Sequence, residues 1–181
     1  MPLLILGLIL WVGAHLFKRI APAARDRLGN AGKGMVAVLL IVGLVLIILG
    51  YRQAEFINVW VPPSWTVHLN NLLMLVALFF FAVSESKGRL RARFRHPQLA
   101  SVKIWAVAHL LVNGDLASII LFGTMLFWAV AEVVLINRAE VWVPKEPGSS
   151  KRDVIVYIAT VVAFVMIAGI HLYLGVSPFP G

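Results

Sequence analysis

The 181-residue sequence contains no cysteine, and only 13% of its residues are charged. Without a thiol, the chain cannot form disulfides, cysteine-ligated iron–sulfur clusters, a covalently attached c-type haem or a thiolate nucleophile. Hydrophobic residues make up 61% of the chain, more than an ordinary soluble domain of this size can cover with polar surface. The composition therefore predicts an integral membrane protein surrounded by the lipid bilayer.

Near-continuous apolar runs follow one another along the chain. They cover residues 2–17, 35–51, 67–84, 98–112, 116–136 and 154–174. Most approach the roughly 20 residues that cross about 30 Å of hydrocarbon, and none alternates like the strands of a barrel. We therefore expect an all-α fold, a polytopic transmembrane bundle of six helices in a single domain, residues 1–181. No basic residue precedes the first run, so we expect it to stay in the mature protein as a span.

Basic residues gather in the connections that follow the first, third and fifth runs. These three connections hold 14 of the 16 lysines and arginines. Because cytoplasmic loops of membrane proteins retain basic residues, we expect both termini on the outer, periplasmic side of a bacterial inner membrane. The net charge of +8 then follows from topology and from attraction to anionic lipid, so we expect no nucleic-acid partner.

Histidines are the polar residues best placed for function, because ionisable groups in hydrocarbon are costly and usually face the bundle interior. The sequence has five, His15, His68, His96, His109 and His171. Counting 1.5 Å per helical residue puts His109 about 6 Å and His171 about 5 Å below the outer surface. His68 starts its helix at that surface, so these three imidazoles form a predicted outer layer. His15 and His96 lie nearer the cytoplasm.

Polar side chains at the same outer level could support the predicted layer by hydrogen bonding. Asn113 and Asp115 precede the fifth run, and we assign them and His68 to this supporting role. His96, nearer the cytoplasm, is a further predicted supporting residue. Asp115 has two interpretations. It can cap the helix that follows by accepting from free backbone N–H groups, or it can orient a histidine that binds a metal.

Haem b is the cofactor that these residue types favour. Two histidines on different helices of a bundle can hold it without any cysteine, whereas zinc or non-haem iron would normally recruit carboxylates. Glu132 is the one carboxylate within a run, and it lies toward the cytoplasm. Depth counting pairs His109 with His171. His15 would lie about 14 Å deeper than His109, whereas two nitrogens on one iron are about 4 Å apart.

Motifs spread along the chain resemble the signature of the NnrU family of bacterial membrane proteins. They are Arg95-His96-Pro97-Gln98, the stretch from Trp105 through Ala106 and His109 to Asn113-Gly114-Asp115, Gly13-Ala14-His15, and the stretch from His171 to Pro178. The resemblance spans nearly the whole chain. The family is associated with denitrification, which implies a role in nitrite or nitric oxide metabolism and partners among respiratory or denitrification membrane proteins.

That family is similar to 15-cis-zeta-carotene isomerase, which holds a b-type haem and isomerises a carotenoid double bond. The similarity implies a lipophilic substrate, with His109 as one haem ligand and His15 as the other. The isomerase has a cysteine three residues before the ligand that His109 matches. Ala106 stands there in this chain, so a ligand switch to sulfur is not expected.

Other functions stay open beside a haem protein with a redox, sensing or isomerase role. One is a cofactor-free accessory protein that assembles or stabilises a respiratory oxidoreductase. Another is a methyltransferase, because membrane enzymes of the isoprenylcysteine type also carry an Arg-His-Pro segment, here Arg95-His96-Pro97. The paired acidic residues that follow it in those enzymes are missing. Whether the protein is an enzyme is left open.

Overall fold

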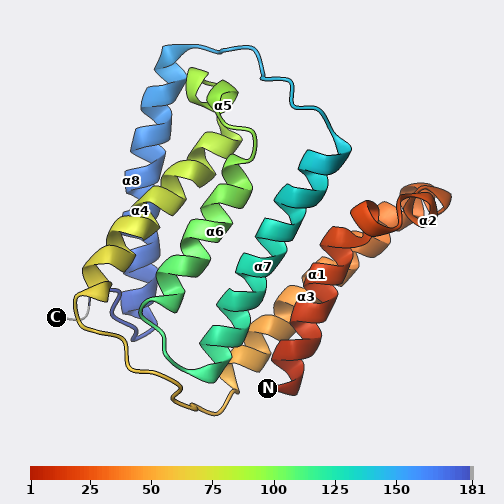
Figure 1. Ribbon diagram of the computed structural model, residues 1–181. Coiled ribbons are helices and arrows are strands. Elements are labelled where there is room, and N and C mark those ends of the chain that lie inside the picture. The colour runs from red at the N-terminus through yellow and green to blue at the C-terminus, as the bar shows by residue number, and fades with distance from the viewer. Residues whose placement is uncertain (180–181) are drawn as a thin grey trace. The chain divides into compact units, whose positions relative to one another are not determined.

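Helices account for all the regular structure in residues 1–179, the part of the chain that the computed structural model describes (Figure 1). The predicted all-α class is therefore confirmed. Within this range five helices are long and apolar enough to cross a membrane. They are α1 (Pro2–Ile20), α3 (Gly29–Arg52), α4 (Thr66–Glu85), α7 (Leu116–Ala139) and α8 (Ser150–Tyr173).

The sixth predicted span forms a shorter helix, α6 (Pro97–Leu110), with 14 residues. At 1.5 Å per residue it is about 21 Å long, less than the hydrocarbon thickness of a bilayer. The structure thus supports five spans by length and composition, while the sixth crossing and the placement of both termini stay predictions. Two short helices, α2 (Pro22–Arg27) and α5 (Arg89–Arg93), lie in basic connections where no helix was predicted.

The chain divides into two compact units, so its description as a single domain also stays a prediction. The first unit comprises residues 1–61 and 114–128, and the second comprises residues 62–113 and the chain from Ala129 onward. In the first unit α1 packs along α3, and in the second α4 packs against both α6 and α8. Residues 180 and 181 lie outside the described part of the chain.

Small residues let α1 and α3 approach closely, as in many pairs of membrane helices. A Cβ atom on Gly7 would lie 2.7 Å from both the carbonyl oxygen of Gly43 and the backbone nitrogen of Ile47. A Cβ atom on Gly50 would collide with the backbone of Leu4. Leu4 itself is fully buried, so this contact forms the core of the first unit.

Large apolar side chains remain exposed on the outer faces of the long helices. Ile41 of α3 is 64% exposed and Val165 of α8 is 63% exposed. Such an uninterrupted apolar surface on several helices would be unusual in water, and it matches contact with lipid chains. The structure is thus that of a multi-pass membrane protein.

Candidate functional site

Histidines on α1, α6 and α8 share one side-chain geometry. In His15, His109 and His171 the ring nitrogen Nδ1 bonds to the carbonyl oxygen of the residue four positions earlier. These acceptors belong to Trp11, Trp105 and Ile167, at 2.9, 2.9 and 2.8 Å. A carbonyl can only accept, so Nδ1 carries the proton and Nε2 carries the lone pair in each neutral ring.

The local sequence explains this geometry. Side chains in an α-helix lean back toward its N-terminus, so an imidazole can reach the carbonyl one turn earlier. At His15 and His109 the residue at that position is a tryptophan, whose ring also packs against the imidazole. The ring centroids of Trp105 and His109 are 5.2 Å apart. The hydrogen bond and the ring contact together fix the orientation of each imidazole.

His109 and His171 lie in the same unit, and both are half-buried. Asn113 supports this region because its side-chain amide donates to the carbonyl oxygen of His109, at 2.8 Å. The structure thus places the pair that depth counting favoured in one unit, and binding of a ligand by this pair stays a prediction.

His15 lies in the other unit, between two tryptophans. Its ring centroid is 4.6 Å from that of Trp11 and 4.5 Å from that of Trp128. The two indoles meet edge to face, 6.0 Å apart. Both indole nitrogens are buried and have no hydrogen-bond partner within residues 1–179, which is uncommon for a buried N–H group. This aromatic cluster is a candidate surrounding for a ligand of His15.

The hydrogen bonds of these three histidines are compatible with ligation of a haem. Histidines that bind metals commonly donate their other ring N–H to a carbonyl or carboxylate, as His15, His109 and His171 do. Residues 1–179 contain no cluster of three or more histidine, cysteine, aspartate or glutamate side chains that could hold a metal ion. A haem requires only one or two axial ligands and an apolar surround, so the residues present are compatible with it.

The remaining predicted histidines differ from these three. His68 is exposed in the first turn of α4. His96 donates through Nε2 to the side-chain oxygen of Asn137, at 2.9 Å. Its proton therefore lies on Nε2, whereas in the other three rings it lies on Nδ1. The neighbouring Arg95 donates to the carbonyl oxygen of Glu140, at 2.6 Å. Arg95 and His96 therefore both connect the start of α6 to the end of α7.

Asp115 is confirmed as a helix cap. Its carboxylate accepts from the backbone N–H of Ser118, at 2.9 Å, and from the Ser118 hydroxyl. The same hydroxyl group bonds to the phenol of Tyr51 at the end of α3, at 2.8 Å. The capping carboxylate is therefore connected to α3 through two side chains. Whether Asp115 also orients a metal-binding histidine stays a prediction.

The sequence did not indicate that Trp128 would flank His15 or that Tyr51 would reach Ser118. Both partners are distant in sequence from the residues that they contact, and both are ordinary residues for a membrane helix. The one available signal was local, the tryptophans four residues before His15 and His109. Contacts within one helix were therefore accessible to sequence analysis, whereas contacts between helices were not.

Long apolar helices with exposed apolar side chains define a polytopic α-helical membrane protein. The family model described as NnrU protein matches residues 3–178. The chain therefore belongs to the NnrU protein family. Comparison with curated proteins and with solved structures gives no match. The implied similarity to carotene isomerase stays a prediction.

Proposed function

We propose that the protein binds haem b in the bacterial inner membrane and has a redox, sensing or isomerase-like role in nitrite or nitric oxide metabolism. One observation carries this proposal. The ring of His109 is oriented by the Trp105 carbonyl so that Nε2 carries the lone pair, and the ring of His171 in the same unit is oriented in the same way by the Ile167 carbonyl. Family membership supports the link to denitrification through its name.

His109 is common to both ligand pairs under consideration. The similar predicted depth of His171 and its place in the same unit favour that residue as the second ligand. The resemblance to the isomerase favours His15, and the indole N–H groups of Trp11 and Trp128 beside it would gain hydrogen-bond partners from a bound group. Substitution of each histidine in turn separates these pairs.

If bound through two of these imidazoles, haem b would supply reversible one-electron chemistry at its iron. The chain's own contribution is orientation and exclusion of water. The carbonyls of Trp105 and Ile167 hold the rings of His109 and His171, and the Trp105 indole packs on the His109 ring. Apolar surroundings of this kind also suit a lipophilic substrate or a membrane-embedded redox partner.

An absorption spectrum of the detergent-solubilised protein, supplied with haem and recorded oxidised and reduced, tests the proposal. We expect a low-spin Soret spectrum that is lost in His109→Ala and in one of His171→Ala and His15→Ala. His68→Ala is the matched control, because this exposed imidazole should leave the spectrum unchanged. A wild-type protein that gives no Soret band after haem supplementation would overturn the proposal.

A cofactor-free accessory protein is the second candidate function. It is favoured by the same hydrogen bonds, because the Nδ1 atoms of His109 and His171 are satisfied by their own helices without any cofactor. In that case His109→Ala would lower the stability of the protein, and the wild-type spectrum would show no haem under any condition. The methyltransferase hypothesis receives less support, since Arg95 and His96 bind the end of α7.

A further inference from the structure

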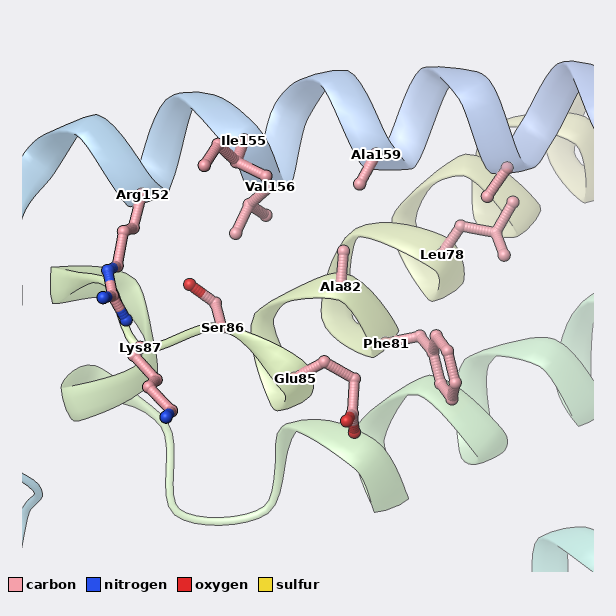
Figure 2. A pocket seen from close by; sticks show the side chains of 11 residues that line it. Leu78, Phe81, Ala82, Glu85, Ser86, Lys87, Arg152, Ile155, Val156 and Ala159 are labelled. Atoms are coloured by element: carbon pink, nitrogen blue, oxygen red, sulfur yellow. The ribbon is translucent and has the colours of Figure 1, made fainter.

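An apolar groove lies between α4 and α8 in the second unit, and it ends among cationic side chains (Figure 2). Its volume is about 660 Å³, within the range of small-molecule binding sites. The apolar wall comes from both helices and consists of Leu78, Phe81, Ala82, Ile155, Val156, Ala159 and Ala163. Three of these seven residues are alanines, whose short side chains leave space between the two helices.

Two cations stand at the polar end of this groove. Figure 2 shows Arg152 and Lys87 near the Ser86 hydroxyl, with Leu78 toward the opposite end. Within residues 1–179, neither the Lys87 ammonium nor the Arg152 guanidinium has an ion-pair or hydrogen-bond partner. The groove therefore offers two uncompensated positive charges beside a hydroxyl donor.

The nearby carboxylates do not neutralise these cations. Glu85 also lines the groove, but its side chain points away from Arg152 and accepts from the Ser84 hydroxyl, at 3.1 Å (Figure 2). Asp153, next to Arg152 in the sequence, accepts from the backbone N–H of Leu90, at 3.1 Å. An anion entering the groove would therefore meet a positively charged end.

Close packing of the backbone fixes the polar end of the groove. A Cβ atom on Gly88 would collide with the carboxylate of Asp153, and a Cβ atom on Gly148 would collide with the carbonyl group of Lys87. The segment that carries Lys87 is thus held against the start of α8, which carries Arg152. The backbone positions that carry the two cations are therefore set by this packing.

The depth of the cations matches that of lipid headgroups. Helix α4 ends at Glu85 and α8 begins at Ser150, so Lys87 and Arg152 lie where the two spans leave the hydrocarbon. Anionic lipids attract basic side chains at this level, and their chains extend along the apolar part of a helix surface. A zwitterionic lipid also carries a phosphate, but its cationic headgroup would bring a further positive charge close to Lys87 and Arg152, which disfavours it relative to an anionic lipid.

We propose that this groove is a specific site for an anionic phospholipid. The lipid phosphate binds Lys87, Arg152 and the Ser86 hydroxyl, and one acyl chain lies between α4 and α8 against Ala82 and Ala159. The site is independent of the proposed haem ligands, since none of the five histidines lines the groove. Lipid at this position would hold α4 and α8 together through contacts that the protein alone does not make.

Native mass spectrometry of the full-length, delipidated protein tests this site by titration with phosphatidylglycerol and with phosphatidylcholine. We expect phosphatidylglycerol to bind more tightly. The double variant Lys87→Gln/Arg152→Gln should weaken its binding about 30-fold, from roughly fivefold for each basic residue near an anionic surface. Ala82→Leu should also weaken binding, because it narrows the groove without changing any charge.

The matched control is Arg138→Gln/Lys145→Gln, which removes the same two charges from exposed positions outside the groove. We expect this control to bind phosphatidylglycerol as the wild type does. Equal losses in the two double variants, or equal binding of both lipids to the wild type, would overturn the proposal. So would unchanged binding in Ala82→Leu together with full displacement by inorganic phosphate. If the double variant fails to fold, Lys87→Gln and Arg152→Gln are measured separately.

Discussion

At the scale of single residues, hydrogen bonds decide which ring nitrogen of each histidine carries the proton. In His15, His109 and His171 the bond to a helix carbonyl places the proton on Nδ1. In His96 the bond to the Asn137 side chain places it on Nε2. A metal binds the nitrogen that has the lone pair, and Nε2 is the one farther from the backbone. The first three rings therefore keep the lone pair on Nε2, as the proposed haem ligation requires, and His96 joins two helices.

Replacing Asp115 by alanine should lower the free energy of unfolding by about 0.5–2 kcal/mol, the usual effect of losing a helix N-cap. The backbone N–H of Ser118 would lose its acceptor, and so would the Ser118 hydroxyl that contacts Tyr51. Thermal unfolding in detergent, followed by circular dichroism, measures the change. Asp115→Asn keeps a capping oxygen and should retain most of the stability. An unchanged midpoint in Asp115→Ala would contradict the capping role.

The Asn-Gly-Asp segment shows what sequence could and could not predict at this scale. Capping by Asp115 followed from its position before an apolar run. The role of Gly114 did not, because its carbonyl oxygen accepts from the backbone of Val59, at 2.8 Å, more than fifty residues earlier. The partner of a backbone group cannot be read from side-chain types. A backbone hydrogen bond between distant residues therefore cannot be predicted before the fold is known.

At the scale of helices, hydropathy located the long elements but misplaced some of their ends. The first run was predicted to end at residue 17, whereas α1 continues to Ile20. Lys18 and Arg19 occupy its last turn, where cations interact favourably with the negative end of the helix dipole. The short helices α2 and α5 were missed because their basic sequences have no apolar periodicity. Basic residues therefore indicate where a span leaves the hydrocarbon, and the helix itself can continue beyond that point.

The contact between α1 and α3 predicts opposite effects for two glycine substitutions in α1. Gly7→Ala would push a methyl group into the backbone of Gly43 and Ile47, so we expect a loss of about 1–3 kcal/mol in the free energy of unfolding. Gly13→Ala has nothing within 4 Å of the new methyl group and should be stabilising by about 0.5–1 kcal/mol. Thermal unfolding in detergent compares the two variants. Equal midpoints would show that α1 and α3 do not pack as closely as described.

At the scale of the whole molecule, backbone hydrogen bonds relate loops that the sequence keeps apart. The loop after α3 is joined to the segment before α7, because the N–H of Val59 donates to Gly114 and the N–H of Leu116 donates to Ile57. These two connections must therefore lie on the same side of the membrane. Helices α4 and α6 lie between these two connections in the chain. The chain must therefore cross the membrane an even number of times between the two connections.

Helix α6 is the element on which the topology depends. Arg95, just before α6, bonds to the carbonyl oxygen of Glu140 after the end of α7, whereas the end of α6 leads directly to the start of α7. With 14 residues, α6 is about 21 Å long, so the non-helical residues on either side of it must complete the distance. We therefore expect α6 to cross the membrane despite its length, which gives six crossings and places both termini on the same side.

Single-cysteine labelling tests this topology, because a chain with no cysteine gives a signal only from the thiol that is introduced. Ser64→Cys, Lys145→Cys and Ser177→Cys are at exposed positions before α4, before α8 and after α8. In intact spheroplasts a membrane-impermeant maleimide should label Ser64→Cys and Ser177→Cys, and Lys145→Cys should react only after permeabilisation. If α6 does not cross, the pattern changes: Lys145→Cys would be labelled with Ser64→Cys, and Ser177→Cys would be protected. The basic connections would then face both sides of the membrane, against the usual retention of lysine and arginine in the cytoplasm.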